Sequence, residues 1–354
     1  MEEIVKSALG QPTRGASAAS EEIEQIKICV VGCGGAGNNT VNRLLRLGIK
    51  GAELYAINTD RQHLATLGDP IKKVLIGKSV TKGLGAGGFP EVGAKCAEVD
   101  RAAIEQILNG AHLVFITAGM GGGTGTGSAP VVAQIAKDQG AIVVAMVSYP
   151  FALERARVAK ADEGIERLRE VADSVIILDN NRLVQIVPNL PMNQAFLVAD
   201  EILGKAISGL VFTITQPSLV NIDFADVRAI MGHGDVGMIS VGSGKGPNKV
   251  AEAVEGVLKN RLLDVDFEGA KGAIIHIAGG NDLTLGDAIR AGEMITECMD
   301  PQANVKWGAR LIPDYDGKLE VCAIVTGVKS PHIVGHAPVK KQEKEVGYDI
   351  EIVG

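Results

Sequence analysis

The sequence predicts an α/β fold with a parallel sheet in a first domain, a long central helix, and a second, smaller α/β domain with a mixed sheet. Two observations predict the first domain. From residue 26 onward, continuous apolar runs alternate with helical patterns, which is typical of a parallel sheet covered by helices on both faces. Glycine-rich segments at 32–37, 83–88 and 119–127 also lie near the ends of predicted strands, as in Rossmann-like nucleotide-binding domains.

The first domain, residues 26–192, is predicted to alternate strands and helices. Strands are expected where apolar residues form short continuous runs, at 28–32, 53–58, 74–76, 113–117, 142–148 and 174–178. Helices are expected where apolar residues recur with a helical period, at 38–47, 91–108, 128–139 and 157–171.

A long helix, predicted from Asn193 to about Phe212 within a linking segment 193–216, joins this domain to the second one at 217–328. The second domain is expected to contain a mixed sheet and two helices, with strands at 237–241, 273–278, 303–312 and 319–325 and helices at 248–261 and 284–298. Residues 1–25 and 329–354 are predicted to be an N-terminal extension and a flexible C-terminal tail. The charged run 340–345 in that tail has no apolar period.

The composition indicates a globular protein. The chain has 354 residues, of which 46% are hydrophobic, enough for two full cores. Only 3% are aromatic and the net charge is −7, so we expect no nucleic-acid partner. The five cysteines contain no Cys-x-x-Cys pair, which suits a reducing cytoplasm. The first 25 residues lack an apolar signal segment, and glycines break the uncharged stretch 110–136, so we expect no direct membrane insertion.

The segment from Gly119 to Ser128 is the strongest functional signal. It lies between an apolar run, 113–118, and a helical pattern, 129–137. Glycines let the backbone turn tightly and direct several N–H groups at one anion, while the helix dipole and nearby hydroxyls add to the attraction. We therefore expect a polyphosphate to bind at Gly119, Gly121, Gly122, Gly123, Thr124, Gly125, Thr126 and Gly127. Gly123 and Gly125 in particular should tolerate no side chain.

The first glycine segment alone is compatible with a dinucleotide-binding enzyme. Gly32-x-Gly34-x-x-Gly37 matches the dinucleotide fingerprint, and Asp60 follows at about the distance of a ribose-binding acid. Because one pyrophosphate needs only one such loop, three loops suit a triphosphate better. An NAD-linked oxidoreductase is the alternative, and nicotinamide binding would distinguish it. No Gly-x-x-x-x-Gly-Lys-Ser/Thr is present, which excludes a P-loop NTPase.

The loop GGGTGTGS, together with Gly32-Cys-Gly-Gly-Ala-Gly-Asn-Asn39, resembles the FtsZ family, the prokaryotic cell-division relatives of tubulin. The likeness runs from about Ile26 to Val328, and the glycine-rich loops are most similar to those of archaeal members. Further motifs follow in the family's order, namely Asn58-Thr-Asp60, Gly83 to Gly88, Tyr149-Pro-Phe151 with Glu154, Asp179 to Arg182, and Asn221 to Arg228. The resemblance implies the tubulin/FtsZ fold.

The resemblance also implies that GTP or GDP binds to the first domain with Mg²⁺, and K⁺ is a candidate further ion. No side chain is assigned as a metal ligand. Besides the loop 119–127, the implied nucleotide-binding residues are Gly34, Gly35, Ala36, Asn38, Asn39, Asn58, Asp60, Ala86, Gly87, Gly88, Pro150, Glu154, Arg157, Asn180, Phe196 and Asp200. Among these, the family places an acid, here Glu154, on the ribose. The spacing after it leaves Arg155 as an alternative to Arg157.

Phe196 and Asp200 are expected to recognise the base. They lie four residues apart on the predicted central helix and therefore project from one face. The ring can stack on a base, and the carboxylate can accept hydrogen bonds from guanine N1–H and N2–H₂ while repelling the adenine N1 lone pair. The alternative is that Phe196 belongs to the core and Asp200 to a solvated helix face.

Asn221, Asp223 and Asp226 are the catalytic candidates. The two carboxylates lie three residues apart, so they can share one face and position a water or a cation. The resemblance implies that this loop completes the active site of a neighbouring subunit when subunits stack head to tail, so that polymerisation activates the GTPase. The alternative is a helix N-cap at Asp223 with Asp226 at the third helical position. The protein would then be a nucleotide-binding scaffold, and phosphate release distinguishes the two.

The resemblance finally implies a cytoskeletal filament that forms the division ring at the cell centre, in the cytoplasm beneath the membrane. The partner is then a second copy of the chain. The tail ends in the short apolar peptide 347–354 after a charged linker, which suits binding to a membrane-tether protein. The six histidines show no convincing ligand spacing, so no transition metal is expected.

Overall fold

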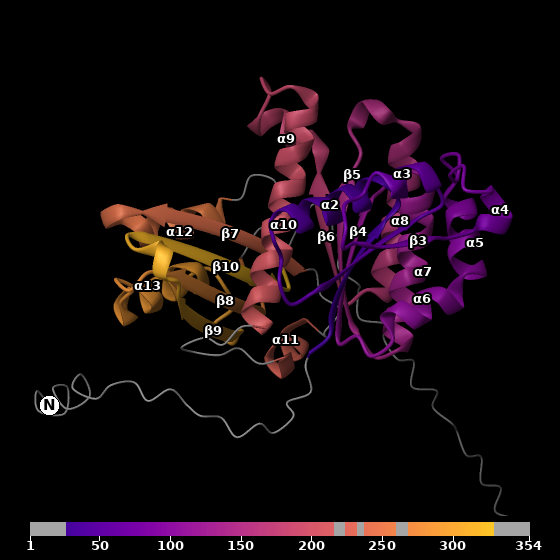
Figure 1. The fold of residues 1–354 in the computed structure, drawn as a ribbon. Helices are drawn as coiled ribbons and strands as arrows, with labels where there is room; N and C mark the ends of the chain where they lie inside the picture. The colour runs from indigo at the N-terminus through magenta and orange to yellow at the C-terminus, as the bar shows by residue number, and fades with distance from the viewer. Residues whose placement is uncertain (1–25, 216–223, 232–236, 260–267, 329–354) are drawn as a thin grey trace, which may run out of the picture.

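The computed structural model describes residues 26–215, 224–231, 237–259 and 268–328. In these segments the chain forms two α/β units that flank a 24-residue helix, α10 (Met192–Thr215), as Figure 1 shows. The predicted class, with its central helix and two sheets, is confirmed. The predicted N-terminal extension, the C-terminal tail, Asn221 and Asp223 lie outside the described residues.

The first unit is a six-stranded, entirely parallel sheet in the order β3-β2-β1-β4-β5-β6. Its strands are β1 (Ile28–Cys33), β2 (Glu53–Asn58), β3 (Lys72–Leu75), β4 (Leu113–Gly119), β5 (Ile142–Tyr149) and β6 (Ser174–Asp179). The central strand β1 is buried along its whole length because helices cover both faces of the sheet. All six strands lie where the apolar runs predicted them, with ends shifted by a residue or two.

The helices of this unit cover the two faces of the sheet (Figure 1). The helix α2 (Gly34–Arg46) lies on one face, where it contacts α10. The other face is covered by α5 (Pro90–Val99), α6 (Arg101–Leu108), α7 (Thr124–Asp138) and α8 (Ala156–Val171). Short helices follow the carboxyl ends of β2, β3 and β6, namely α3 (Arg61–Ala65), α4 (Lys78–Thr81) and α9 (Asn180–Ile186).

Two helix starts and one helix interior differ from the sequence prediction. The helices α2 and α7 begin four residues earlier than expected, inside their glycine segments, because packing against the sheet and neighbouring loops overrides the low helix propensity of glycine. The predicted helix 91–108 is two helices separated at Asp100. The Asp100 carboxylate accepts a hydrogen bond from the Gly77 amide at 2.6 Å, a tertiary contact that fixes the break.

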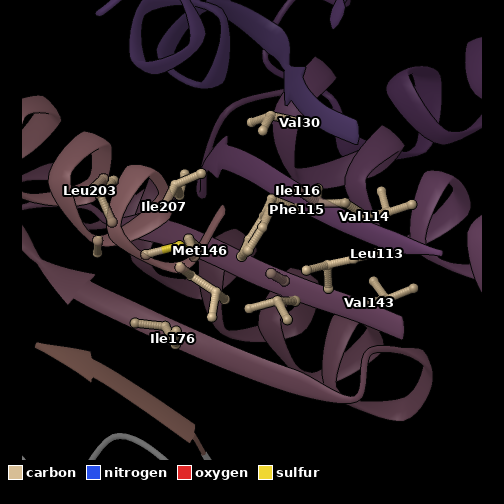
Figure 2. Close-up of a cluster of buried hydrophobic side chains, with 14 of the residues drawn as sticks. Val30, Leu113, Val114, Phe115, Ile116, Val143, Met146, Ile176, Leu203 and Ile207 are labelled. Atoms are coloured by element: carbon tan, nitrogen blue, oxygen red, sulfur yellow. The ribbon is translucent and has the colours of Figure 1, made fainter. Parts of the chain in front are cut away.

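The central helix is part of both cores. Figure 2 shows Leu203 and Ile207 of α10 beside Met146 and Ile176 of the parallel sheet. Further along α10, Phe212 lies edge-on to the ring of His276 in the second unit, with centroids 6.5 Å apart. Burial lowers the pKa of His276 to about 4, so this imidazole packs as a neutral ring at neutral pH.

The second unit is a four-stranded mixed sheet in the order β7-β10-β8-β9, in which only β8 and β9 pair in parallel. The strands are β7 (Gly237–Lys245), β8 (Gly272–Gly279), β9 (Asn304–Leu311) and β10 (Lys318–Thr326), with the helices α12 (Lys249–Leu258) and α13 (Leu285–Thr296). The mixed sheet is as predicted, although β7 runs four residues beyond its expected end.

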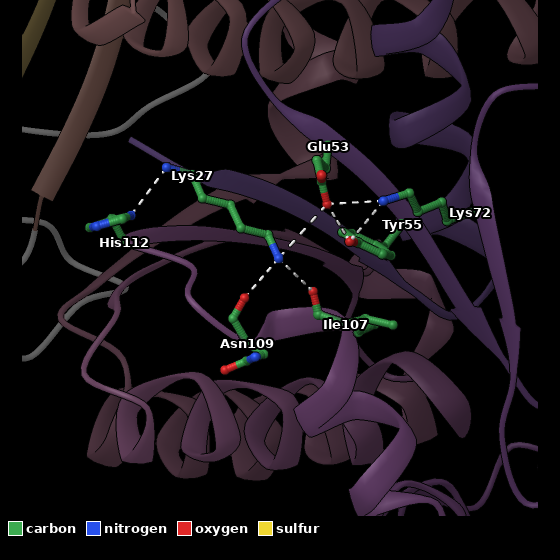
Figure 3. Close-up of polar contacts among 7 residues, drawn as sticks. All are labelled: Lys27, Glu53, Tyr55, Lys72, Ile107, Asn109 and His112. Atoms are coloured by element: carbon green, nitrogen blue, oxygen red, sulfur yellow. Dashed lines mark hydrogen bonds and ion pairs between the residues drawn. The ribbon is translucent and has the colours of Figure 1, made fainter. Parts of the chain in front are cut away.

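A polar network lies at the amino ends of the parallel strands, as Figure 3 shows. The Lys27 amide donates to Nδ1 of His112 at 3.1 Å, and the Lys27 ammonium donates to the Asn109 carbonyl at 2.8 Å. The other side of this edge contacts helix α11 (Phe224–Met231), because the rings of His112 and Phe224 meet edge to face at 5.9 Å. Helix α11 is therefore docked at the amino end of the sheet.

None of the helices in the described segments is both long enough and apolar enough to cross a lipid bilayer.

Candidate functional site

A cavity of about 600 Å³ opens at the other end of the parallel sheet, at the carboxyl ends of its central strands. Its walls come from the start of α2, the loop between β4 and α7, the segment after β5, and the first half of α10. A cavity of this size accommodates a nucleotide. The predicted site residues that line it are Gly35, Ala36, Asn39, Gly119, Gly122, Gly123, Thr124, Gly125, Pro150, Glu154, Arg157, Asn180, Phe196 and Asp200.

The glycines of the loop 119–125 permit close backbone packing as well as an open cavity. A Cβ at Gly125 would lie 2.8 Å from the Gly119 carbonyl oxygen, and one at Gly34 would lie 2.7 Å from the Gly125 amide nitrogen. Gly34 also has a positive φ of 72°, which favours glycine. The first and third glycine segments therefore touch and form one continuous surface at the start of two helices, a position where backbone N–H groups are available to an anion.

The middle glycine segment lies behind this surface. A Cβ at Gly123 would lie 2.9 Å from the Ala86 side chain and 3.1 Å from the Gly88 amide nitrogen. Ala86, Gly87 and Gly88 are therefore next to Gly123 but are not part of the cavity wall.

Other predicted residues shape the loops rather than line the cavity. Asn38 is fully buried. The Asn58 side chain accepts a hydrogen bond from the Thr59 amide at 2.9 Å, and the Asp60 carboxylate caps α3 by accepting from the His63 amide at 3.1 Å. Gly127 lies where α7 touches α5, and a Cβ there would overlap the Pro90 carbonyl. Gly34, Gly121 and Thr126 likewise do not line the wall.

Phe196 and Asp200 reach the cavity together, as their spacing on one helix face predicts. The Phe196 ring is 38% exposed, which argues against the core alternative, and it lies edge-on to Phe151 with centroids 5.9 Å apart. The Asp200 carboxylate accepts a hydrogen bond from the Thr40 hydroxyl at 2.8 Å. Burial raises the pKa of Asp200 above its ordinary value, partly offset by that hydrogen bond.

Arg157, and not Arg155, faces the glycine loop. Arg157 lines the cavity, and its guanidinium would lie 3.7 Å from a Cβ at Gly122. It forms an ion pair with Glu154, whose other carboxylate oxygen accepts from the Phe151 amide at 3.0 Å. These contacts fix both side chains at one wall of the cavity.

Several residues in the wall were not predicted from the sequence, namely Thr40, Thr117, Ala118, Met120, Ser148, Phe151, Ala199 and Leu203. Thr40 lies one helical turn after Ala36, so the helical period of α2 could have identified it. Phe151 belongs to the motif Tyr149-Pro-Phe151, and its contact with Phe196 depends on tertiary packing alone.

The catalytic candidate Asp226 lies far from the cavity. It is in the first turn of α11, where it forms an ion pair with Lys306 of β9 at 2.9 Å. The helix α10 runs between the two places, and its 24 residues correspond to about 36 Å at 1.5 Å per residue. Figure 1 shows α11 at the opposite end of α10 from α9, whose first residue, Asn180, lines the cavity.

The comparisons with known proteins identify the family. Residues 27–188 match the GTPase domain of the Tubulin/FtsZ family, and residues 235–329 match the C-terminal domain of the FtsZ family. The chain belongs to the FtsZ family. A curated relative, "Cell division protein FtsZ 2" of Methanocaldococcus jannaschii, is 59% identical over 318 residues, which cover 89% of this chain and 83% of that protein. The protein of the same name from Halobacterium salinarum (strain ATCC 29341) is 51% identical over 349 residues, covering 97% and 88%.

Solved structures give the same result. An "FtsZ dimer, empty" from M. jannaschii is 44% identical, with a TM-score of 0.80 and coverage of 92% of both chains. CetZ1 from Haloferax volcanii, at 24% identity and a TM-score of 0.74, shares the fold. Membership of the FtsZ family confirms the resemblance and the tubulin/FtsZ fold. The similarity to archaeal members is confirmed by the relatives from M. jannaschii and H. salinarum. Family membership also removes the oxidoreductase alternative, because the first unit is a GTPase domain of a family that binds guanine nucleotide.

Proposed function

We propose that this FtsZ chain binds and hydrolyses GTP, assembles head to tail into filaments, and forms the division ring at the cell centre, with each active site completed by the next subunit. One observation carries the shared site. The phosphate-binding loops lie at the carboxyl end of the parallel sheet, whereas Asp226 lies on α11 at its amino end. Two halves so far apart can meet only between two molecules stacked end to end.

In the proposed complex, the nucleotide lies along the walls of the cavity. The base lies between Phe196 and the Asp200 carboxylate, and Asn180 adds hydrogen-bonding groups beside it. The ribose lies against Pro150 and Glu154. The phosphates then lie on the backbone N–H groups of the loop 119–125 and the start of α2, with the Arg157 cation beside them. Sugar and base stay near α10, and the terminal phosphate points toward Gly123.

The oxygen atoms near Gly123 fit a Mg²⁺ ion that is held mainly by phosphates and water. The Thr124 hydroxyl lines the cavity there, 2.6 Å from the hydroxyl of the buried Thr59, while the Asp60 carboxylate caps α3. Mg²⁺ prefers oxygen ligands and commonly takes only one or two from the protein. When bound, the ion would neutralise the charge that develops on the phosphates. K⁺ stays a candidate further ion.

The catalytic step needs a group that positions the attacking water. The acidic side chains in the described cavity wall are Glu154, paired with Arg157, and Asp200, bonded to Thr40. We assign the water to Asp223 and Asp226 of the next subunit, with Asn221 as a hydrogen-bonding side chain beside them. Carboxylates can orient the water and accept its proton, and phosphoryl transfer depends mostly on such positioning.

Self-association has support from a relative, since the similar M. jannaschii structure is an FtsZ dimer. We place the filament in the cytoplasm, at the division site beneath the membrane. A membrane-tether protein would bind the apolar end of the C-terminal tail. The tail, 329–354, lies outside the described residues, so this partner rests on the sequence pattern alone.

The experiment that tests the shared site is phosphate release per subunit against protein concentration. We expect the specific rate to rise steeply above a threshold at which light scattering and sedimentation first detect filaments. A specific rate that stays flat down to concentrations with only monomer would contradict the shared site. Absence of phosphate release at any concentration would favour the alternative of a nucleotide-binding scaffold.

Asparagine at Asp200 is expected to weaken GTP binding by about 1–3 kcal/mol, because a partly donating group faces guanine N1–H and N2–H₂. ATP should gain little. Because burial raises the pKa of Asp200, its carboxylate becomes protonated at a higher pH than an ordinary aspartate does. Protonation removes the hydrogen-bond acceptor. As the pH falls, the GTP affinity of the wild type should therefore begin to decrease at this higher pH. Titration with labelled GTP and ATP at several pH values measures both effects.

The control for Asp200→Asn is Glu201→Gln, the same change at the next residue, whose carboxylate pairs with Arg43 instead of facing the cavity. It should leave nucleotide selectivity unchanged. Equal affinities of the wild type for GTP and ATP would show that Asp200 does not select the base.

A further inference from the structure

Helix α8 contacts two of the three glycine segments through two cationic residues, one helical turn apart. The Arg157 guanidinium faces Gly122, as described above, and a Cβ at Gly121 would lie 2.9 Å from the Arg157 Cβ. Lys160 donates a hydrogen bond from its ammonium group to the Gly88 carbonyl at 2.7 Å, and the same group lies 5.3 Å from the ring centroid of Phe89. Lys160 therefore holds the carboxyl end of the segment 83–88 by a charged hydrogen bond and a cation–π contact.

The segment 83–88 needs such a contact. Four of its six residues are glycines with positive φ, a conformation that only glycine adopts readily but that an unrestrained glycine leaves easily. Its first half is fixed to the loop after β2, because the Gly85 amide donates to the Thr59 carbonyl at 3.1 Å. At its other end, a Cβ added to Gly88 would meet no atom within 4 Å, so that side of the residue is open, while Gly123 packs on its amide side.

The position of this end matters for the phosphates. Gly123, in the cavity wall, packs directly against the carboxyl end of the segment 83–88, since a Cβ at Gly123 would lie 2.9 Å from the Phe89 amide nitrogen. Base and ribose are placed at the α10 side of the cavity, and the segment 83–88 lies on the far side of Gly123. The residues that line the cavity wall therefore suffice to bind the two phosphates of a diphosphate. A third phosphate extends toward the segment that Lys160 holds.

We propose that Lys160 is a positioning residue that latches the segment 83–88 against the phosphate loop and so sets the preference for a nucleoside triphosphate over a diphosphate. This inference rests on the proposed nucleotide site and extends it. Lys160 touches the loop and acts on the nucleotide through it. With the latch intact, the backbone N–H groups of 86–88 stay where the terminal phosphate arrives, and no ordering of a glycine segment is needed on binding.

The test compares Lys160→Met and Lys160→Arg in the full chain. Methionine keeps an unbranched stem against Phe89 but removes the donor and the charge, whereas arginine keeps both. Each protein is titrated with a labelled non-hydrolysable GTP analogue and with GDP, below the concentration at which filaments form. Lys95→Met is the matched control, since Lys95 is exposed on α5 and the same change there should alter neither affinity.

We expect the wild type to prefer the triphosphate analogue. In Lys160→Met, the triphosphate affinity should fall about fivefold to tenfold, the size expected for one charged hydrogen bond at a partly exposed site, while GDP affinity stays unchanged. Lys160→Arg should restore most of the preference. Amide hydrogen exchange of the segment 83–88 with the triphosphate bound should be faster in Lys160→Met than in the wild type.

Three results would overturn the latch. These are unchanged affinities for both nucleotides in Lys160→Met, an equal loss of both affinities, which marks a general structural role, and unchanged exchange of the segment 83–88. The proposed function fails separately. In that case, the wild type itself would bind neither guanine nucleotide, whatever stands at position 160.

Discussion

Alanine at Asp226 is expected to slow phosphate release by about 100-fold or more, the scale of a lost general base, while GTP still binds and filaments still form. GTP binding persists because α11 is at the opposite end of the molecule from the cavity. Filaments should persist longer than those of the wild type because their nucleotide is not consumed. In mixtures with wild-type protein, the rate per total subunit should fall in proportion to the share of the variant, since each junction that receives its α11 is inactive.

The measurements are nucleotide titration, sedimentation and phosphate release above the assembly threshold. The control is Lys306→Met, which breaks the same ion pair but leaves the carboxylate in place. That pair is partly exposed, so its loss should cost at most about 1 kcal/mol of stability. If Lys306→Met slows hydrolysis as much as Asp226→Ala does, the pair supports the loop and Asp226 is not catalytic. If Asp226→Ala hydrolyses GTP at the wild-type rate, Asp226 only stabilises the first turn of α11.

Valine at Gly122 should abolish nucleotide binding and assembly while the fold stays intact. Gly122 has no positive φ, and the nearest atom to a Cβ there is a guanidinium nitrogen of Arg157 at 3.7 Å. The side chain would therefore enter the cavity without striking the backbone. We expect GTP affinity to fall by more than about 100-fold, because the added atoms keep the phosphates away from the loop N–H groups.

Circular dichroism and thermal unfolding show whether the fold of Gly122→Val is retained, and titration measures its nucleotide affinity. Gly292→Val is the matched control, since a Cβ at that half-buried position of α13 meets no atom within 4 Å. It should bind GTP normally. A folded Gly122→Val protein with wild-type affinity would show that the phosphates do not lie on this loop.

Most of the fold could be predicted because its signals are local. The strands of the parallel sheet are buried on both faces, so each is a continuous apolar run that the sequence displays directly. The break at Asp100 could not be predicted, since it depends on a hydrogen bond to Gly77, 23 residues away in the chain. The early starts of α2 and α7 were missed for a similar reason. Glycine disfavours helix locally, and only tertiary packing reverses that preference.

In the candidate site, too, residues with a local sequence pattern could be predicted, and those that depend on contacts distant in the chain could not. The spacing of Phe196 and Asp200 predicts their shared helix face from the sequence alone, whereas their expected role at the base comes from the family resemblance. The helical period of α2 could have identified Thr40, but its hydrogen bond to Asp200, 160 residues away, has no local signal. The latch at Lys160 has no sequence signal either, since its acceptor is a backbone carbonyl and any residue type supplies one.

The placement of the cavity and α11 at opposite ends of the molecule has a consequence for filaments of finite length. In a filament built as proposed, one terminal subunit presents an open cavity that no neighbour completes, and the other presents an unused α11. Every filament therefore has one fewer complete site than it has subunits, and its last nucleotide survives. Short filaments lose a larger share of their sites than long ones, so the average turnover per subunit becomes a measure of filament length.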